Sequence, residues 1–266
     1  MGHELPGQSL ATIIVKAAPR VGQTHGELVC CAGIDPGGVW VRLYPVAFRT
    51  LDDAQKFGRW DIVQYKWSLP KGDHRCESRR VEHRSVSITG HLKNEGAREN
   101  LVAPLIVDSL EDEYKAGRSL AFIRPRNPYF IIEKKDKGQY EEEKAHFLEW
   151  HRHETEGLFG HMGYMNKGTV PYEPAPYNFK YSYEISDGKR EGTCQDWEVE
   201  ATFLKWRREY GEAKALQYMA ETFGEKYPQK GFVLAMGTHK AYGNWLINGI
   251  VRLNHGAEKA VRGSLF

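Results

Sequence analysis

The segment Glu27-Leu-Val-Cys-Cys-Ala-Gly-Ile34, followed by Asp35-Pro-Gly-Gly38 and Val39-Trp-Val-Arg-Leu-Tyr-Pro-Val46, decides the fold. Its two apolar runs are separated by a Pro-Gly turn signal, which is typical of antiparallel strands joined in a hairpin. Short apolar or alternating runs continue on both sides of it and predict strands at residues 11–17, 60–67 and 79–89, with one or two helical turns at 50–57.

The rest of the chain mixes strands with short helices. Ser109 and Asp112 have the spacing of a capping box and predict the start of a short helix, which Gly117 would end. Thr193 with Asp196 predicts a second cap, at the start of a later helix. Strands are expected at 119–123, 129–134, 179–185, 232–236 and 245–253, and helical patterns at 197–210 and 212–227. Because strands and helices do not alternate regularly, the pattern indicates a mainly β protein with inserted helices (α+β), built as two small β-barrels.

Charge and proline patterns divide the chain. Residues 134–144 carry mixed charges, which favours an exposed connection, and three prolines at 171, 174 and 176 precede the third section. We predict an N-terminal barrel at 1–135, a connecting segment at 136–175 and a C-terminal β/α domain at 176–266.

The composition excludes several classes of protein. The 266 residues have a formal charge of only +2, so nucleic-acid binding would need a local basic patch. The four cysteines show no framework spacing, which suits a reducing compartment. The start of the sequence has no basic and apolar leader, and no apolar run approaches the ~20 residues of a membrane span. A cytoplasmic protein without membrane contact is expected.

Two groups of residues are candidates for binding nucleic acid. The period of two along 39–46 places Trp40, Arg42 and Tyr44 on one strand face, where rings can stack on bases and a guanidinium can meet phosphate. The alternative is a packed second face with Arg42 in a structural ion pair. The second group is a run of arginines, a residue type that binds phosphate in bidentate fashion. It consists of Arg75, Arg79, Arg80 and Arg84, with Arg124 and Arg126 as a weaker extension. The alternative is a solvated, charged face of a strand.

Other clusters favour structural roles. Phe179, Tyr181 and Tyr183 share a strand face that is typical of a core stripe. Asp196, Glu198 and Glu200 would converge on a metal only in a strand, and the predicted helix spreads them apart. The histidines at 146, 151, 153 and 161 lack the spacing of a zinc site. Gly237-Thr238-His239 predicts a tight turn, and no nucleotide-binding or hydrolase motif is present.

Two stretches of the sequence carry a resemblance to a known family. The first runs from Trp40-Val-Arg-Leu-Tyr-Pro45 through Phe48-Arg49 and Phe57-Gly-Arg-Trp60 to Arg75-Cys-Glu-Ser78; the second comprises Cys194-Gln-Asp-Trp-Glu198, Gly237-Thr238 and Trp245-Leu-Ile-Asn-Gly249. Together they resemble the dual OB-fold domain family of bacterial and archaeal conflict systems. Cys76 departs from the pattern, which has Pro there. The resemblance implies two OB-like barrels that recognise nucleic acid in defence against mobile elements, and it supplies no catalytic residues.

We therefore predict a non-catalytic protein that binds RNA or single-stranded DNA, with no metal or cofactor. Two alternatives stay open. One is an enzyme, either a metal-dependent nuclease using Asp196, Glu198 and Glu200 or a base-processing enzyme with a pocket near His239. The other is a protein-interaction subunit of a defence complex, which an exposed apolar patch without a basic groove would mark.

Overall fold

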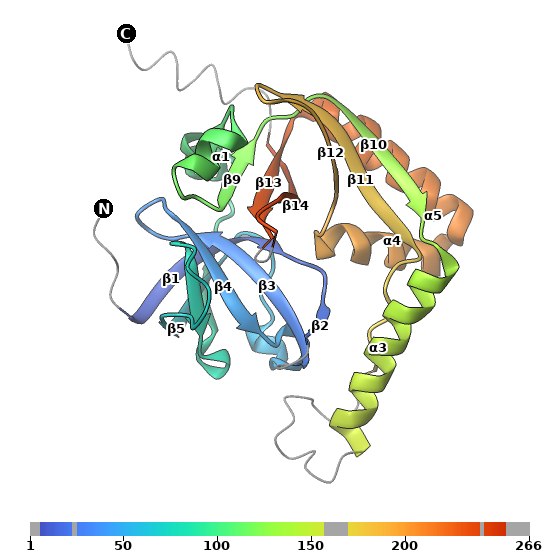
Figure 1. Ribbon diagram of the computed structural model, residues 1–266, viewed down its shortest axis with the longest axis horizontal. Coiled ribbons are helices and arrows are strands. Elements are labelled where there is room, and N and C mark those ends of the chain that lie inside the picture. The colour runs from blue at the N-terminus through green and yellow to red at the C-terminus, as the bar shows by residue number, and fades with distance from the viewer. Residues whose placement is uncertain (1–5, 23–25, 157–169, 240–241, 254–266) are drawn as a thin grey trace.

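The computed structural model describes residues 6–22, 26–156, 170–239 and 242–253, and shows a β-barrel beside a second half of sheets and helices (Figure 1). The predicted hairpin is confirmed, with β3 (Gly26–Ile34) and β4 (Trp40–Val46) paired antiparallel. Asp35 closes its turn, because the backbone carbonyl accepts from Gly38 N at 3.0 Å and the carboxylate accepts from Val39 N at 2.9 Å. One turn residue thus fixes the register of the hairpin.

Five strands close into a barrel. The hairpin is joined by β1 (Gly7–Lys16), β5 (Asp61–Ser68) and β6 (Ser78–Val81), in the order β1-β3-β4-β6-β5, and β5 pairs back onto β1. β4 and β6 are parallel, whereas the other barrel pairs are antiparallel. This closed five-stranded arrangement is OB-like. β2 (Arg20–Gly22) and β7 (Ser87–His91) extend its edges, and short 3₁₀ turns at Phe48–Thr50, Asp53–Gln55 and His83–Ser85 join its strands.

The second half contains two further sheets. One has the order β10-β11-β12 and the other β14-β13-β9-β8, and a bridge between Cys194 and Ile247 connects them. The strands are β8 (Ile106–Val107), β9 (Leu120–Ile123), β10 (Arg126–Lys134), β11 (Tyr177–Ile185), β12 (Gly188–Thr193), β13 (Phe232–Thr238) and β14 (Trp245–Arg252). They are consistent with a second OB-like unit, and the predicted fold class, mainly β with inserted helices, is confirmed.

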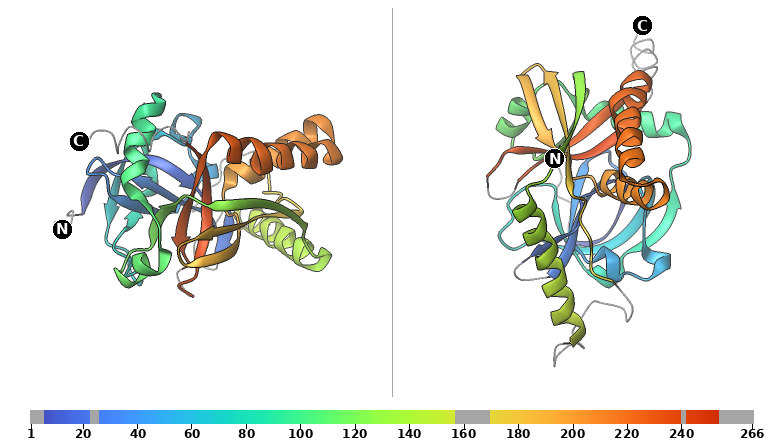
Figure 2. Two further views of the ribbon diagram at one scale, coloured as in Figure 1. Left: turned by 90° about the horizontal axis from the view of Figure 1, so that it is seen from above. Right: turned by 90° about the vertical axis from the view of Figure 1, so that its right-hand side faces the viewer.

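Helices surround these sheets. They are α1 (Glu95–Val102), a 3₁₀ turn at Ala103–Leu105, α2 (Leu110–Lys115), α3 (Lys137–Glu156), α4 (Trp197–Tyr210), α5 (Glu212–Met219), a π-helical segment at Ala220–Lys226 and α6 (Tyr227–Lys230). α4 and α5 cover one face of β10 and β11 (Figure 2), and α4 begins against the barrel, where the ring of Trp197 lies 5.4 Å from that of Phe48. Within the described ranges, no helix is long and apolar enough to cross a membrane.

A shared apolar cluster joins the two halves. The outer faces of β1, β3 and β4 contribute Ile14, Ala32 and Trp40, which pack with Phe122 of β9 and Val233 of β13. The rings of Trp40 and Phe122 have their centroids 4.5 Å apart. The part of the barrel wall that carries strands β3 and β4 is therefore covered by the second half.

Several predictions needed correction. The segment predicted as an exposed connection is mostly exposed, but it contains the helix α3, which was not predicted. The run at 79–89 is split into β6 and β7, and α1 and β12 were also not predicted. The cap of α4 is Asp196, whose carboxylate accepts from Glu198 N at 3.0 Å, and not Thr193, which ends β12. Gly237 belongs to β13 rather than to a turn, and a Cβ there would lie 2.0 Å from Nδ2 of Asn248, so a larger residue would displace the Asn248 side chain.

Candidate nucleic-acid interface

Trp40 and Arg42 are buried, which corrects their predicted role as ligand contacts. They share a strand face as predicted, but Trp40 packs in the apolar cluster that joins the barrel to the second half, so that face is covered. The Arg42 guanidinium donates to the backbone carbonyl of Ser119 at 3.1 Å and to its hydroxyl at 3.2 Å. Ser119 in turn donates its amide and hydroxyl to the buried carboxylate of Glu77, at 2.7 and 2.8 Å. Arg42 is therefore a structural residue of the seam between the halves.

Tyr44, the third residue of that face, lies on the surface. Its side chain is 43% exposed, and β4 pairs it in parallel register with Arg80 of β6, which in turn pairs with Ser68 of β5. Residues paired across neighbouring strands project to the same side of a sheet. A tyrosine ring and an arginine therefore stand side by side on the outer barrel wall.

A groove of about 770 Å³ lies next to this pair. Its charged lining consists of Lys66, Arg80 and Glu82, and its floor includes Trp67 and Val81. Among the residues that the structure describes, neither Lys66 nor Arg80 forms an ion pair with a carboxylate. We call this surface the barrel groove; it is lined by Pro6, Gly7, Gln8, Leu28, Pro45, Ala47, Lys66, Trp67, Ser68, Arg80, Val81 and Glu82.

Arg79 closes one end of the barrel. Its guanidinium lies over the ring of Trp67, 4.3 Å from the centroid, and donates to the carbonyl of Cys76 at 2.9 Å. The Trp67 indole N–H donates to Ser9 Oγ at 2.9 Å, so both the face and the edge of the ring are held. Arg79 supports the groove by fixing its aromatic floor, and its cation adds to the positive potential there.

Arg75 is held in the loop between β5 and β6. Its guanidinium forms a bidentate pair with Asp73, at 2.8 and 2.7 Å, and donates to the carbonyl of Thr238 at 2.8 Å. Partial burial would raise the pKa of Asp73, but the hydrogen bonds from Arg75 and Ser78 outweigh it and lower the pKa to about 2. The loop is thereby fastened to the end of β13, and Arg75 has little freedom to reach a phosphate.

The remaining predicted arginines are spread over the molecule. Arg84 is exposed beside β6, but it does not line the barrel groove. Arg126 donates to the carbonyl of Ile185 at 2.9 Å, and Arg124 is half-buried at the start of the same segment. Both lie in the second half, so only Arg79 and Arg80 of the predicted set reach the barrel groove or its floor.

The predicted core stripe is confirmed, since Phe179, Tyr181 and Tyr183 are buried in the apolar core to which α4 and α5 also contribute.

The carboxylates of the alternative metal site diverge. Asp196 and Glu198 approach Arg59, whereas Glu200 accepts from Ala175 N at 2.5 Å. Residues 197–210 form a helix and not the strand that would favour a nuclease site.

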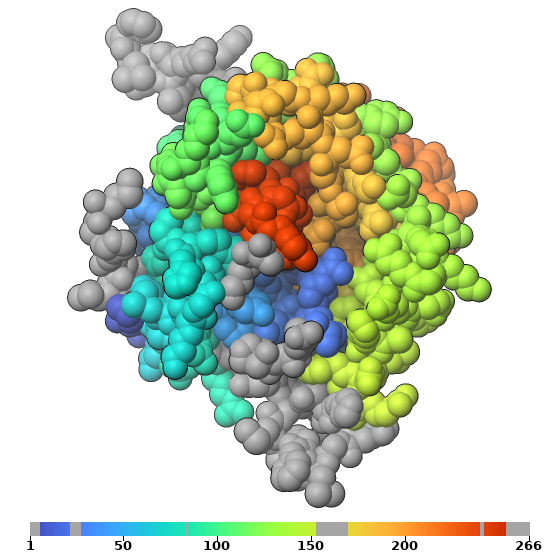
Figure 3. Space-filling view, in the orientation of Figure 1, coloured from blue at the N-terminus to red at the C-terminus, as the bar shows by residue number. Residues whose placement is uncertain are grey.

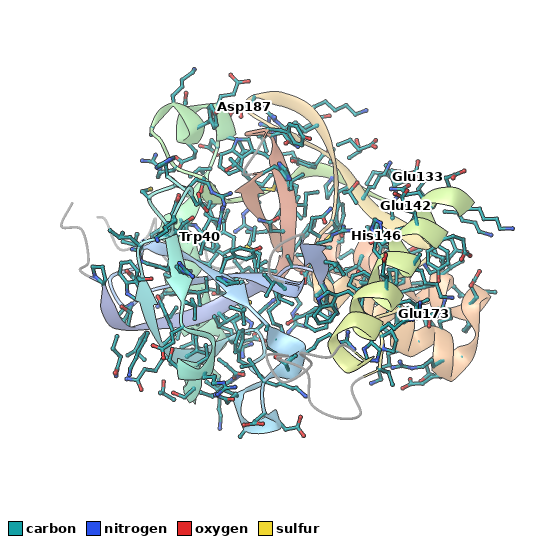
Figure 4. All side chains as sticks on the ribbon, turned by 60° about the horizontal axis from the view of Figure 1, so that its bottom comes forward. Trp40, Glu133, Glu142, His146, Glu173 and Asp187 are labelled. Carbon is teal, nitrogen blue, oxygen red and sulfur yellow. The ribbon has the colours of Figure 1, made fainter. Side chains whose placement is uncertain are left out.

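The histidine cluster forms no metal site in the described part of the chain. His146 lies exposed on α3, one turn after Glu142 (Figure 4). Among described residues, no group of three or more His, Cys, Asp or Glu side chains is arranged to hold a metal. The side chain of His153 and all of His161 lie outside the described residues.

Lys66 and Trp67 were missed as site residues although the sequence carried a signal for them. Alternation along residues 61–68 places Val63, Tyr65 and Trp67 inside the barrel and Lys66 outside. The alternation does not specify which strand pairs with residues 61–68, so the pairing of this strand with β6 could not be predicted from it.

Comparison with solved structures gives distant matches, two of which are as follows. One, described as "Molecular basis for abrogation of activation of pro-inflammatory cytokines", has 7% identity, a TM-score of 0.31, and covers 73% of this chain and 78% of that chain. Another, described as "Structure and Conformational Change of a Replication Protein A Heterotrimer Bound to ssDNA", has 10% identity, a TM-score of 0.27, and covers 99% of this chain and 69% of that chain. Both scores are too low to support an inference about this protein. No curated protein sequence matches the chain.

Two family models match consecutive parts of the chain. Residues 9–104, which include α1 and the whole barrel except the first two residues of β1, match the family described as "Domain of unknown function (DUF8758)". The two matched ranges adjoin at residue 105. The domain boundaries expected from the sequence, at 135 and 175, stay a prediction. The second model spans residues 106–263, more than half of the protein, and the chain therefore belongs to the family described as "Domain of unknown function (DUF8757)".

Proposed function

We propose that this protein binds single-stranded nucleic acid, RNA or DNA, in the barrel groove. The observation that carries the proposal is the parallel pairing of Tyr44 with Arg80 beside a groove that also presents Lys66. An exposed ring offers a stacking surface to an unpaired base, and the two cations lie where a backbone phosphate would be neutralised.

The groove lies on a part of the barrel that the second half leaves open. OB-fold barrels bind oligonucleotides on the face of their second and third strands, which here are β3 and β4. The end of that face near Trp40 is covered, while the end near Tyr44 is exposed. A strand of nucleic acid would therefore lie toward the β4, β6 and β5 side of the barrel.

The test is a fluorescence-anisotropy titration with labelled single-stranded RNA, single-stranded DNA and duplex DNA, at several salt concentrations. We expect salt-sensitive binding of the single strands. The double variant Lys66→Ala/Arg80→Ala should weaken binding and reduce the slope of log affinity against log salt by about 0.7 for each phosphate that the protein no longer neutralises. A matched control is Lys205→Ala/Arg208→Ala, which removes two exposed cations from α4.

Wild-type affinity and salt slope in the groove variant would contradict the proposal. The same titration with and without magnesium, followed by electrophoresis of the probe, separates binding from cleavage, and magnesium-dependent cleavage would favour the nuclease alternative. A role in defence and a cytoplasmic location stay predictions that rest on the sequence and its resemblance.

A further inference from the structure

Three exposed rings gather at the turn between β13 and β14. His239 and Tyr242 stack, with their centroids 4.9 Å apart and their planes inclined by 16°. The side chain of Tyr242 is 82% exposed and that of Tyr114, on α2, 58%. Large aromatic side chains in such open positions are typical of surfaces that bind a partner.

Gly243 brings Tyr114 to this turn. Its φ is +67°, which is readily adopted only by glycine, and a Cβ at this position would lie 3.0 Å from the hydroxyl of Tyr114. The turn and α2 therefore meet as one surface, although they are far apart in the sequence. We call the three side chains, His239, Tyr242 and Tyr114, the ring platform.

The ring platform is connected to the barrel groove through the loop between β5 and β6. Arg75 of this loop donates to the carbonyl of Thr238, next to His239, and Asp73 accepts from Ser78 Oγ at 2.9 Å. Ser78 and Arg80 lie on the same strand, about 7 Å apart. Figure 3 shows the β13–β14 end (red) beside the β5–β6 segment (cyan) on one face of the molecule.

Among the described residues, three cationic side chains near the ring platform are paired with carboxylates. Arg118 forms a bidentate pair with Glu113, Lys115 lies 3.7 Å from Asp112, and Arg75 is paired with Asp73. Binding at this surface would therefore depend on ring contacts more than on free positive charge, unlike binding in the barrel groove. Stacking of bases on aromatic side chains has this property and tolerates any base.

We propose that the ring platform is a second stacking site for the same single strand that binds the barrel groove. The strand would leave the groove at Arg80, follow the β5–β6 loop and place later bases on Tyr242 and His239. This inference rests on the proposed function, and it extends the ligand from a short oligonucleotide to one long enough to reach both halves of the protein.

The experiment compares two oligothymidylates, one of about 6 nucleotides, near the smallest OB-fold site, and one of about 18. Tyr242→Ala should weaken binding of the longer oligonucleotide about tenfold, leave the shorter one unchanged, and keep the salt slope of the wild type. Tyr242→Phe should bind as wild type. Tyr129→Ala is the matched control, since Tyr129 of β10 is 69% exposed.

The outcomes separate this inference from the proposed function. If Arg80→Ala weakens both oligonucleotides but Tyr242→Ala binds the longer one as wild type does, the ring platform is excluded and the groove stands. If Tyr242→Ala loses affinity equally for both oligonucleotides, Tyr242 belongs to the binding site in the barrel groove, and the proposal of a second site is wrong. If the wild type binds neither length, whether as oligothymidylate or as oligouridylate, both proposals fall. Photocross-linking of a 5-iodouracil oligonucleotide should yield an adduct at Tyr242, and an adduct only at groove residues would count against the inference.

Discussion

The Arg59 guanidinium lies 2.7 Å from the carboxylate of Asp196, and this buried ion pair links the barrel to the second half. Asp196 also accepts from the backbone N–H of Ile250 at 2.9 Å and caps α4, while Arg59 donates to the carbonyl of Ile250 at 2.6 Å. Burial alone would lower the pKa of Arg59, but Asp196 and Glu198 raise it, so the guanidinium stays charged. One pair thus connects the start of β5, β14 and the first turn of α4.

We expect Arg59→Ala to lower the free energy of unfolding by about 3–5 kcal/mol, because the carboxylate of Asp196 would remain buried without its counter-charge. Chemical denaturation measures this. Lys56→Ala is the control, since its pair with Asp53 is exposed to solvent and contributes little to stability. Similar stability of the two variants would show that the Arg59 pair is not a stabilising link.

Trp40 should prove to be a residue of the seam and not of the binding surface. Trp40→Ala is expected to cost about 3–5 kcal/mol of stability, because it leaves a cavity against Phe122. Trp40→Phe should cost less, since in the described part of the structure the indole Nε1 has no hydrogen-bond partner to lose. Oligonucleotide affinity, measured where Trp40→Phe is fully folded, should equal that of the wild type; a loss of several fold would restore Trp40 as a ligand-binding residue.

Tyr44 is expected to act through its ring. Tyr44→Ala should weaken single-strand binding by about 1–3 kcal/mol, the usual contribution of one stacked base, while Tyr44→Phe should retain most of the affinity. Burial and the neighbouring Cys30 raise the pKa of the Tyr44 hydroxyl, so it stays neutral at pH 7 and repels no phosphate. Anisotropy titrations of both variants test this, and equal losses in the two would instead assign the effect to the hydroxyl.

Asp73 should make stability depend on pH in the acid range. Its pKa is about 2 in the folded protein, against an ordinary value of 3.8, so the folded state favours the ionised carboxylate. The resulting stabilisation, roughly 1 kcal/mol after solvent screening, is present at neutral pH and is lost as the pH falls from about 4 to about 2. Asp73→Asn should lower stability at pH 7 and flatten this part of the curve, which denaturation at a series of pH values will show. An unchanged acid profile would contradict the assignment.

The sequence by itself determined the local features of this protein. The Asp35 turn, the alternation within β5 and the Ser109 cap each depend on residues a few positions apart, and all three are present. The fold class follows from them, because short strands without regular helical crossovers favour barrels. The cap of α4 was misplaced by three residues, since Thr193 and Asp196 are both good caps and only the strand β12 decides between them.

Only the tertiary structure decided which strand face would be open. A period of two correctly places Trp40, Arg42 and Tyr44 together, but it does not tell a solvent-facing side from one covered by a distant segment of the chain. The packing of Phe122 and Ser119 against this face buries two of the three, and the parallel pairing of β4 with β6 gives Tyr44 its neighbour Arg80. Long-range packing decided which part of this face stays open, because the loss of water from apolar side chains, which drives the two halves together, depends on buried area and not on sequence order.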